Sequence, residues 1–182
     1  MYFDSYGPFR ITLDSKITSA QQTFWKAVRD KSSHYDHKEK ELEGSFDCYV
    51  FGIEWGKTLT PWYVGQTVAE TGFKGEIFQQ HKLDICNDVA ENKNGNPIVF
   101  LFPLLTPDGY FSKNRSDLNK RLVTWTERML FGFAITKNPE CRNKQNTKFL
   151  RECTINGVMG PPVPGRLERM ASNARRLLYP AV

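Results

Sequence analysis

Two short runs of β-forming and aromatic residues, at 46–53 and 62–64, limit most strongly how this chain can fold. The segment between them contains glycine and proline, which favour a turn. Two strands joined by so short a connection normally pair side by side and antiparallel. Tyr49 lies in the first run and Tyr63 in the second. The sequence therefore predicts a hairpin that brings these two tyrosines into neighbouring strands.

The rest of the pattern predicts a short N-terminal strand, one further core strand and several helices. The N-terminal strand is indicated by a run of period two over residues 9–13. Residues 97–105 form an apolar run between turn-forming segments, which is typical of a strand. Helices are predicted from about residue 18, over about 73–83 and over about 116–135, the last with Ser116 as its N-cap. This order predicts an α+β fold, a small antiparallel or mixed β-sheet of about three strands flanked by helices, with extra N- and C-terminal helices. In the long helix, five apolar side chains recur at helical spacing: Leu118, Leu122, Trp125, Met129 and Phe133.

The chain is expected to have three parts. Residues 1–44 form an N-terminal extension with a helix, and residues 45–156 form the core. Residues 157–182 contain a Pro/Gly-rich linker, followed by a basic helix that packs on or beside the core. A chain of 182 residues can bury such a core without disulfides or structural metals.

Composition narrows the class of protein only weakly. The formal net charge of +5 suits a polyanionic partner, and it equally suits a slightly basic globular protein without one. The four cysteines include no C-x-x-C pair, which argues against a zinc knuckle and favours reduced thiols in the cytoplasm. The first residues lack the features of a signal peptide, and no apolar stretch is long enough to span a membrane. A cytoplasmic location without membrane contact is therefore predicted, and the oligomeric state is left open.

Glu127 is the carboxylate that most needs an explanation. It lies in the predicted helix 116–135, with apolar neighbours such as Val123 one turn away on both sides. Burying a carboxylate without a partner is strongly unfavourable, so a cation, hydrogen bonds or a bound metal must compensate. The alternative is a glutamate at the edge of the buried face that pairs with Arg121 or Arg128.

The residues after Tyr63 give the two tyrosines a possible function. Gly65, Gln66 and Thr67 come directly after the second strand run. A glycine at the end of a strand allows a backbone or a ligand to approach closely. The alternative is that Tyr49 and Tyr63 only pack in the core, as most strand tyrosines do.

In the order and spacing of these residues, the chain resembles the GIY-YIG nuclease superfamily over residues 46–143. Tyr49-Val50-Phe51 is similar to the family's first motif, although Asp47-Cys48 stands in place of the usual Gly-Ile. Trp62-Tyr63-Val64-Gly65 is similar to the second motif. Three later residues come in the family's order: His81 on a helix, Glu127 on the long helix, and Asn143 beyond it.

The resemblance implies hydrolysis of DNA phosphodiester bonds with one divalent metal ion, Mg²⁺ or Mn²⁺, held by Glu127 and by phosphate oxygens. Tyr49 is then expected to position or deprotonate the attacking water, while Tyr63 supports it or holds phosphate. Asn143 is expected to orient the site through hydrogen bonds. The implied catalytic residues are Tyr49, Tyr63, His81, Glu127 and Asn143, and the implied substrate-binding residues are Gly65, Gln66 and Lys74.

One departure from the family concerns positive charge. The family normally carries an arginine on the helix after the second motif, and residues 73–81 contain none. Lys74, two turns before His81, is expected to supply charge instead, whereas Lys82 is expected to point elsewhere. Glu76 is an alternative occupant of the arginine's place, where it would repel phosphate or serve as a second metal ligand.

The sequence leaves three functions open. The first is a metal-dependent DNA endonuclease. The second is a catalytically weakened relative that binds nucleic acid without cleaving it, which the missing arginine and the net charge of +5 favour. The third is an interaction protein that keeps only the fold, which requires that the tyrosines, His81 and Glu127 do not converge on one open concavity.

Overall fold

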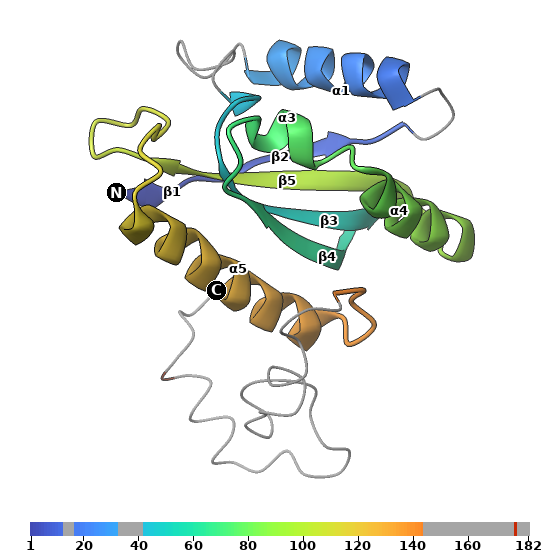
Figure 1. Ribbon diagram of the computed structural model, residues 1–182. Coiled ribbons are helices and arrows are strands. Elements are labelled where there is room, and N and C mark those ends of the chain that lie inside the picture. The colour runs from blue at the N-terminus through green and yellow to red at the C-terminus, as the bar shows by residue number, and fades with distance from the viewer. Residues whose placement is uncertain (13–16, 33–41, 144–176, 178–182) are drawn as a thin grey trace.

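The computed structural model describes residues 1–12, 17–32, 42–143 and 177. In chain order the elements are β1 Tyr2–Phe3, β2 Tyr6–Arg10, α1 Ile17–Ser32, β3 Asp47–Trp55, β4 Thr58–Thr67, α3 Gly72–Glu76, α4 Gln80–Asn92, β5 Asn96–Leu105 and α5 Asp117–Lys137 (Figure 1). No helix within these ranges is both long and apolar enough to cross a membrane. Apart from Leu177, the linker and the basic helix predicted for residues 157–182 lie outside the described residues.

The sheet is antiparallel throughout, and β3 lies between β4 and β5. The predicted hairpin is confirmed, since Tyr49 pairs with Gly65, and Phe51 with Tyr63, across β3 and β4. Gly56 in the turn has a φ of +59°, a conformation that glycine adopts without a steric penalty. The hairpin therefore holds the two tyrosines on adjacent strands, with Tyr49 on the central strand β3 and Tyr63 on the edge strand β4.

The sheet has five strands rather than about three. The additional strands, β1 and β2, come from the first ten residues, and both pair with β5. β2 overlaps the strand-like run predicted over 9–13 only at Phe9 and Arg10, and it extends back over Gly7 and Pro8, which normally indicate a turn. Pairing with β5, together with the burial of Tyr6 and Phe9, stabilises this segment as a strand. The N-terminal residues thus complete the same sheet that carries the hairpin.

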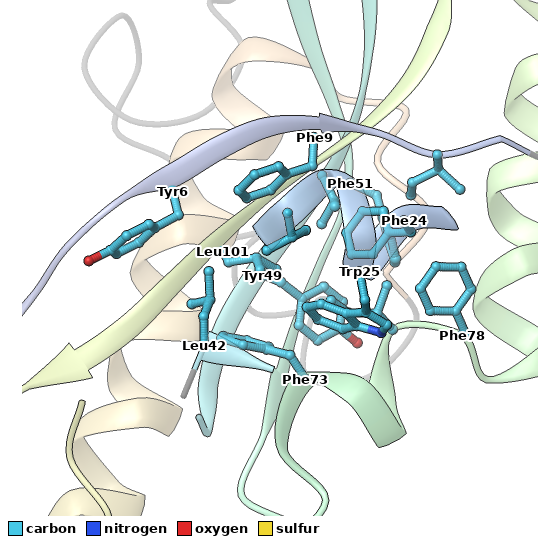
Figure 2. Packing of buried hydrophobic residues seen from close by; sticks show 14 of the residues in the cluster. Tyr6, Phe9, Phe24, Trp25, Leu42, Tyr49, Phe51, Phe73, Phe78 and Leu101 are labelled. Carbon is cyan, nitrogen blue, oxygen red and sulfur yellow. The ribbon is translucent and has the colours of Figure 1, made fainter. Parts of the chain in front are cut away.

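Helices cover both faces of this sheet. In Figure 1, α1 and α3 lie over one face and α5 lies over the other. The core under α1 is rich in aromatic residues: Phe24 lies 4.9 Å from Trp25 and 5.2 Å from Phe78 between ring centroids, and the same cluster reaches Tyr49 (Figure 2). A smaller cluster joins α5 to β4 through Phe131 and Val64. Helix α1 therefore contributes to the core that buries the first tyrosine.

The helix predicted over 73–83 is two helices, α3 and α4. Gln79 between them is extended, with φ −66° and ψ 139°. Ile77, just before the break, is buried in the main core, which holds the chain at this bend. Lys74 and His81 therefore do not share one helical face, and α4 begins a new direction toward the hairpin.

The long helix α5 is confirmed, but the stripe it buries was not apparent from the sequence. Ser116 is its N-cap and accepts a hydrogen bond from the backbone N–H of Asn119. Its buried residues are Asn119, Val123, Phe131, Ala134 and Ile135. The large apolar residues left exposed are Leu118, Trp125, Met129 and Phe133. Because both sets recur at helical spacing, periodicity alone does not show which set faces the sheet.

Asp47, at the start of β3, is a buried acid. Its side chain is 1% exposed, and its Oδ2 accepts a hydrogen bond from the backbone N–H of Leu104. Burial raises the pKa of Asp47 to about 8. The folded state therefore keeps a proton that the unfolded chain releases above about pH 4.

From about pH 4 to pH 8 we expect the free energy of unfolding to fall as pH rises, by up to about 1.4 kcal/mol per pH unit from this group. An Asp47→Asn variant should lack this slope, because its side chain does not titrate. Urea unfolding at several pH values measures it, with the exposed Asp108→Asn as control. A slope in Asp47→Asn equal to that of the wild type would contradict the assignment.

Candidate functional site

A polar cavity of about 830 Å³ lies between β4, α4 and α5. Five of the predicted site residues line it: Tyr63, Gln66, His81, Glu127 and Asn143. The other three, which are Tyr49, Gly65 and Lys74, are not among the described residues that line it. The hairpin, the first turn of α4 and the middle of α5 thus bring most of the predicted residues to one concave surface.

Tyr49 and Tyr63 lie side by side but differ in their access to this cavity. Their ring centroids are 6.3 Å apart, and their ring planes are tilted by 32°. Tyr49 is fully buried, and its hydroxyl donates to Oε1 of Glu76 at 3.5 Å, whereas Tyr63 is half-buried and reaches the cavity. Burial raises the pKa of both hydroxyls, and the negative charge of Glu127 adds to this. Both tyrosines are therefore protonated at neutral pH.

Gly65 makes room for Tyr49. A Cβ at Gly65 would lie 2.3 Å from both Cζ and Oη of the Tyr49 ring, well inside van der Waals contact. Tyr49 and Gly65 are directly paired across β3 and β4, so the ring passes over the glycine on its way to Glu76. Position 65 therefore requires glycine because the Tyr49 ring of the neighbouring strand occupies the space of a side chain.

Lys82 brings a buried positive charge beside the tyrosine pair. Its side chain is only 2% exposed, and Nζ binds the carboxylate of Glu76 and, at 3.2 Å, the backbone oxygen of Glu76. Nζ also lies 5.2 Å from the centroid of the Tyr49 ring. Burial lowers the pKa of Lys82, and Glu76 opposes that shift. The prediction that Lys82 points elsewhere is wrong, because the break at Gln79 turns the start of α4 toward the hairpin.

Glu127 is half-buried on α5 and faces the cavity. Burial raises its pKa, while the positive charges of Arg128 and Lys82 oppose that shift. Within the described part of the chain, its carboxylate makes no direct hydrogen bond or ion pair, including with Arg121 or Arg128. The carboxylate is therefore available to a ligand that enters the cavity.

The two amide side chains of the site, Asn143 and Gln66, each form hydrogen bonds that join β4 to another segment. Asn143 accepts a hydrogen bond from the N–H of Val64 at 2.9 Å and donates one to the carbonyl of Val64 at 2.6 Å. This pair fastens the segment after α5 to β4, next to Tyr63. Gln66 accepts from the hydroxyl of Thr124 at 3.3 Å, which links β4 to α5 one turn before Glu127. Both contacts fix the position of Glu127 relative to Tyr63.

His81 and Lys74 lie in different surroundings. His81 is exposed in the first turn of α4 and lines the cavity. Lys74 is on α3, where its Nζ lies 3.5 Å from a carboxylate oxygen of Glu43, and it does not line the cavity. The positive charge expected from Lys74 is supplied at the cavity by Lys82 and by Arg128.

Sequence reasoning missed the roles of Lys82 and Arg128, and it left that of Glu76 open. No local pattern marks Lys82, because its burial depends on a break between helices and on the ring of Tyr49. Arg128 is next to Glu127 in the sequence, which shows proximity but not that it lines a cavity. Asp88 and Arg142, 2.9 Å apart, also line the cavity and join α4 to the segment after α5.

No cluster of three or more side chains of the types that bind metal ions occurs in the described ranges. Among the described carboxylates that line the cavity, Glu127 is the one without a hydrogen-bond or ion-pair partner. Comparisons of the chain with models of protein families, with curated proteins and with solved structures find no match.

Proposed function

We propose that the protein is a divalent-metal-dependent endonuclease that hydrolyses DNA phosphodiester bonds in this cavity, as a divergent relative of the GIY-YIG nucleases. The observation that carries the proposal is the Glu127 carboxylate, which has no partner within the described part of the chain and opens on the same cavity as Tyr63 and His81. An antiparallel hairpin with a tyrosine on each strand, followed by a helical glutamate, also agrees with the resemblance of the sequence to that family.

Glu127 fits a hard cation that keeps most of its water. Mg²⁺ and Mn²⁺ favour carboxylate oxygen, and Mg²⁺ commonly binds through one or two carboxylates together with substrate phosphates. Bound there, such an ion would stabilise negative charge on the phosphate and on the leaving oxygen. Glu76 does not offer a second ligand, because Lys82 and Gln79 already bind its carboxylate.

Tyr63 is the tyrosine suited to contact water and substrate. Its hydroxyl reaches the cavity, whereas Tyr49 is buried behind it. Since both hydroxyls stay protonated at neutral pH, Tyr63 orients a water molecule or donates to a phosphate oxygen and does not remove a proton. Behind Tyr63, Lys82 binds Glu76 and Glu76 accepts from Tyr49, whose ring packs against that of Tyr63 at a centroid distance of 6.3 Å. His81 is exposed at the cavity, where its imidazole can hydrogen-bond to a water molecule or a phosphate oxygen.

The test is plasmid nicking with the wild type and Glu127→Gln. The wild type should nick supercoiled plasmid with Mg²⁺ or Mn²⁺ and should not do so in EDTA. Glu127→Gln should lose about 100-fold or more of this activity, because it removes charge stabilisation of the transition state. Glu91→Gln, an exposed glutamate on α4, is the matched control and should keep full activity. Activity that survives in Glu127→Gln, or a wild type inert with both metals, contradicts the proposal.

A second candidate is a protein that binds nucleic acid without cutting it. The observation in its favour is that the buried cation beside the two tyrosines is a lysine already paired with Glu76, and an ammonium group does not make bidentate phosphate contacts. Salt-dependent DNA binding without nicking in either metal would support this function over the first.

A further inference from the structure

The outer face of α5 carries a stripe of large apolar side chains that the sheet does not cover. It consists of Leu118, Trp125, Met129 and Phe133, and Trp125 is 62% exposed. Gly132 lies beside this stripe, and a Cβ there would meet nothing within 4 Å. Exposed aromatic residues gathered along one face are uncommon on a surface that has no partner.

Positive charge lies along one side of this stripe. Arg121 precedes Trp125 by four positions and Arg128 comes three positions after it, so both lie one helical turn from the indole on the same side of α5. Within α5 the only carboxylates are Asp117, at the first position, and Glu127, which faces the cavity. The exposed indole is therefore flanked by two guanidinium groups. The nearest carboxylate on the helix, that of Glu127, faces the cavity instead.

The stripe is continuous with the cavity through Arg128. This residue lines the cavity next to Glu127 and also lies one turn from Trp125. A chain-like ligand that reaches Glu127 would pass Arg128 and meet the indole. A second copy of the protein fits this face less well, because it would bring together two positively charged surfaces of a chain with a net charge of +5.

We infer that the outer face of α5 binds an unpaired DNA strand, with the Trp125 indole stacked on a base and with Arg121 and Arg128 on the neighbouring phosphates. Aromatic side chains interleaved with cations are the chemistry by which single strands are held without sequence preference. The inference rests on the proposed function in one respect: it specifies a DNA with unpaired bases beside the cleavage site as the substrate.

Binding is measured by fluorescence anisotropy of a labelled single-stranded oligonucleotide of mixed sequence, in EDTA so that cleavage does not intervene. Trp125→Ala should raise the Kd by about 5- to 150-fold, the loss expected for one stacked base. Trp55→Ala is the matched control, because Trp55 is 63% exposed at the tip of the β3–β4 hairpin. Binding to the duplex of the same sequence should change little in either variant.

The charge part is tested by salt titration. Arg121→Gln should lower the slope of log Kd against log salt by about 0.7, as expected for one lost phosphate contact on a single strand. Lys57→Gln, at the tip of the same hairpin as Trp55, should leave the slope unchanged.

An unchanged Kd in Trp125→Ala overturns the inference, and so does an equal loss for single strand and duplex. If Trp125→Ala instead converts a dimer to a monomer in sedimentation without changing DNA binding, the face joins two copies and the inference fails. These outcomes are separate from those of the nicking assay. If Trp125 is needed for single-strand binding but the wild type does not nick, the nuclease proposal fails and the binding surface stands. If nicking depends on Glu127 but Trp125→Ala binds single strands as the wild type does, the nuclease proposal stands and the binding surface fails.

Discussion

Replacing Lys82 with methionine is expected to lower the free energy of unfolding by about 3 kcal/mol, because the Glu76 carboxylate then loses its buried cation. Breaking a buried ion pair from one side costs about 3–5 kcal/mol. We expect the lower end of this range, since the Glu76 side chain is 19% exposed and keeps its hydrogen bonds from Gln79 and Tyr49. Urea unfolding followed by tryptophan fluorescence measures the loss.

Lys93→Met is the control for the Lys82 variant. Lys93 pairs with Glu140 at 3.2 Å, but its side chain is 47% exposed, so its loss should cost less than about 1 kcal/mol. The double variant Glu76→Gln/Lys82→Met should recover much of the stability, because no unpaired charge remains. If Lys82→Met costs no more than Lys93→Met, then the Lys82–Glu76 pair does not stabilise the site.

Gly65→Ala is expected to destabilise the fold by about 3 kcal/mol, at the upper end of the range for inserting one methyl group into a packed core. The new Cβ would overlap Cζ and Oη of Tyr49 at 2.3 Å. Tyr49 has little room to move, because Phe51 and Phe73 pack against its ring at centroid distances of 5.4 Å and 6.4 Å. Thermal and urea unfolding measure this loss.

Gly132→Ala is the matched control for the Gly65 variant. It places the same methyl group in open space on α5, where alanine should stabilise the helix by about 0.5–1 kcal/mol. The double variant Tyr49→Leu/Gly65→Ala should lose less stability than the two single changes added together, since the smaller side chain removes the overlap. Equal stability of Gly65→Ala and Gly132→Ala would show that Tyr49 moves aside freely.

Local sequence patterns were sufficient for the elements that carry the site. β-forming runs with a short turn predicted the β3–β4 hairpin, and apolar periodicity with a Ser116 cap predicted α5 nearly to its ends. These features depend on neighbours in the chain, which is what a sequence displays directly. Five of the eight predicted site residues line one cavity because two neighbouring strands and one long helix carry most of them.

Long-range packing decided the rest. β2 is a strand because it pairs with β5, although its Gly7 and Pro8 indicate a turn. The break at Gln79 between α3 and α4 contains no proline or glycine, and Ile77, just before it, is buried in the core. Because of this break Lys82, and not Lys74, lies beside the tyrosines.

The sequence by itself thus determined that Tyr49 and Tyr63 would be neighbours and that Glu127 would lie on a helix with apolar surroundings. Only the tertiary structure decided that Tyr49 is buried and Tyr63 open, and that α5 turns Glu127 to the cavity and Trp125 outward. The physical reason is that strand pairing and helix periodicity are set within short segments. The exposure of a side chain depends instead on which residues, distant in the chain, cover it.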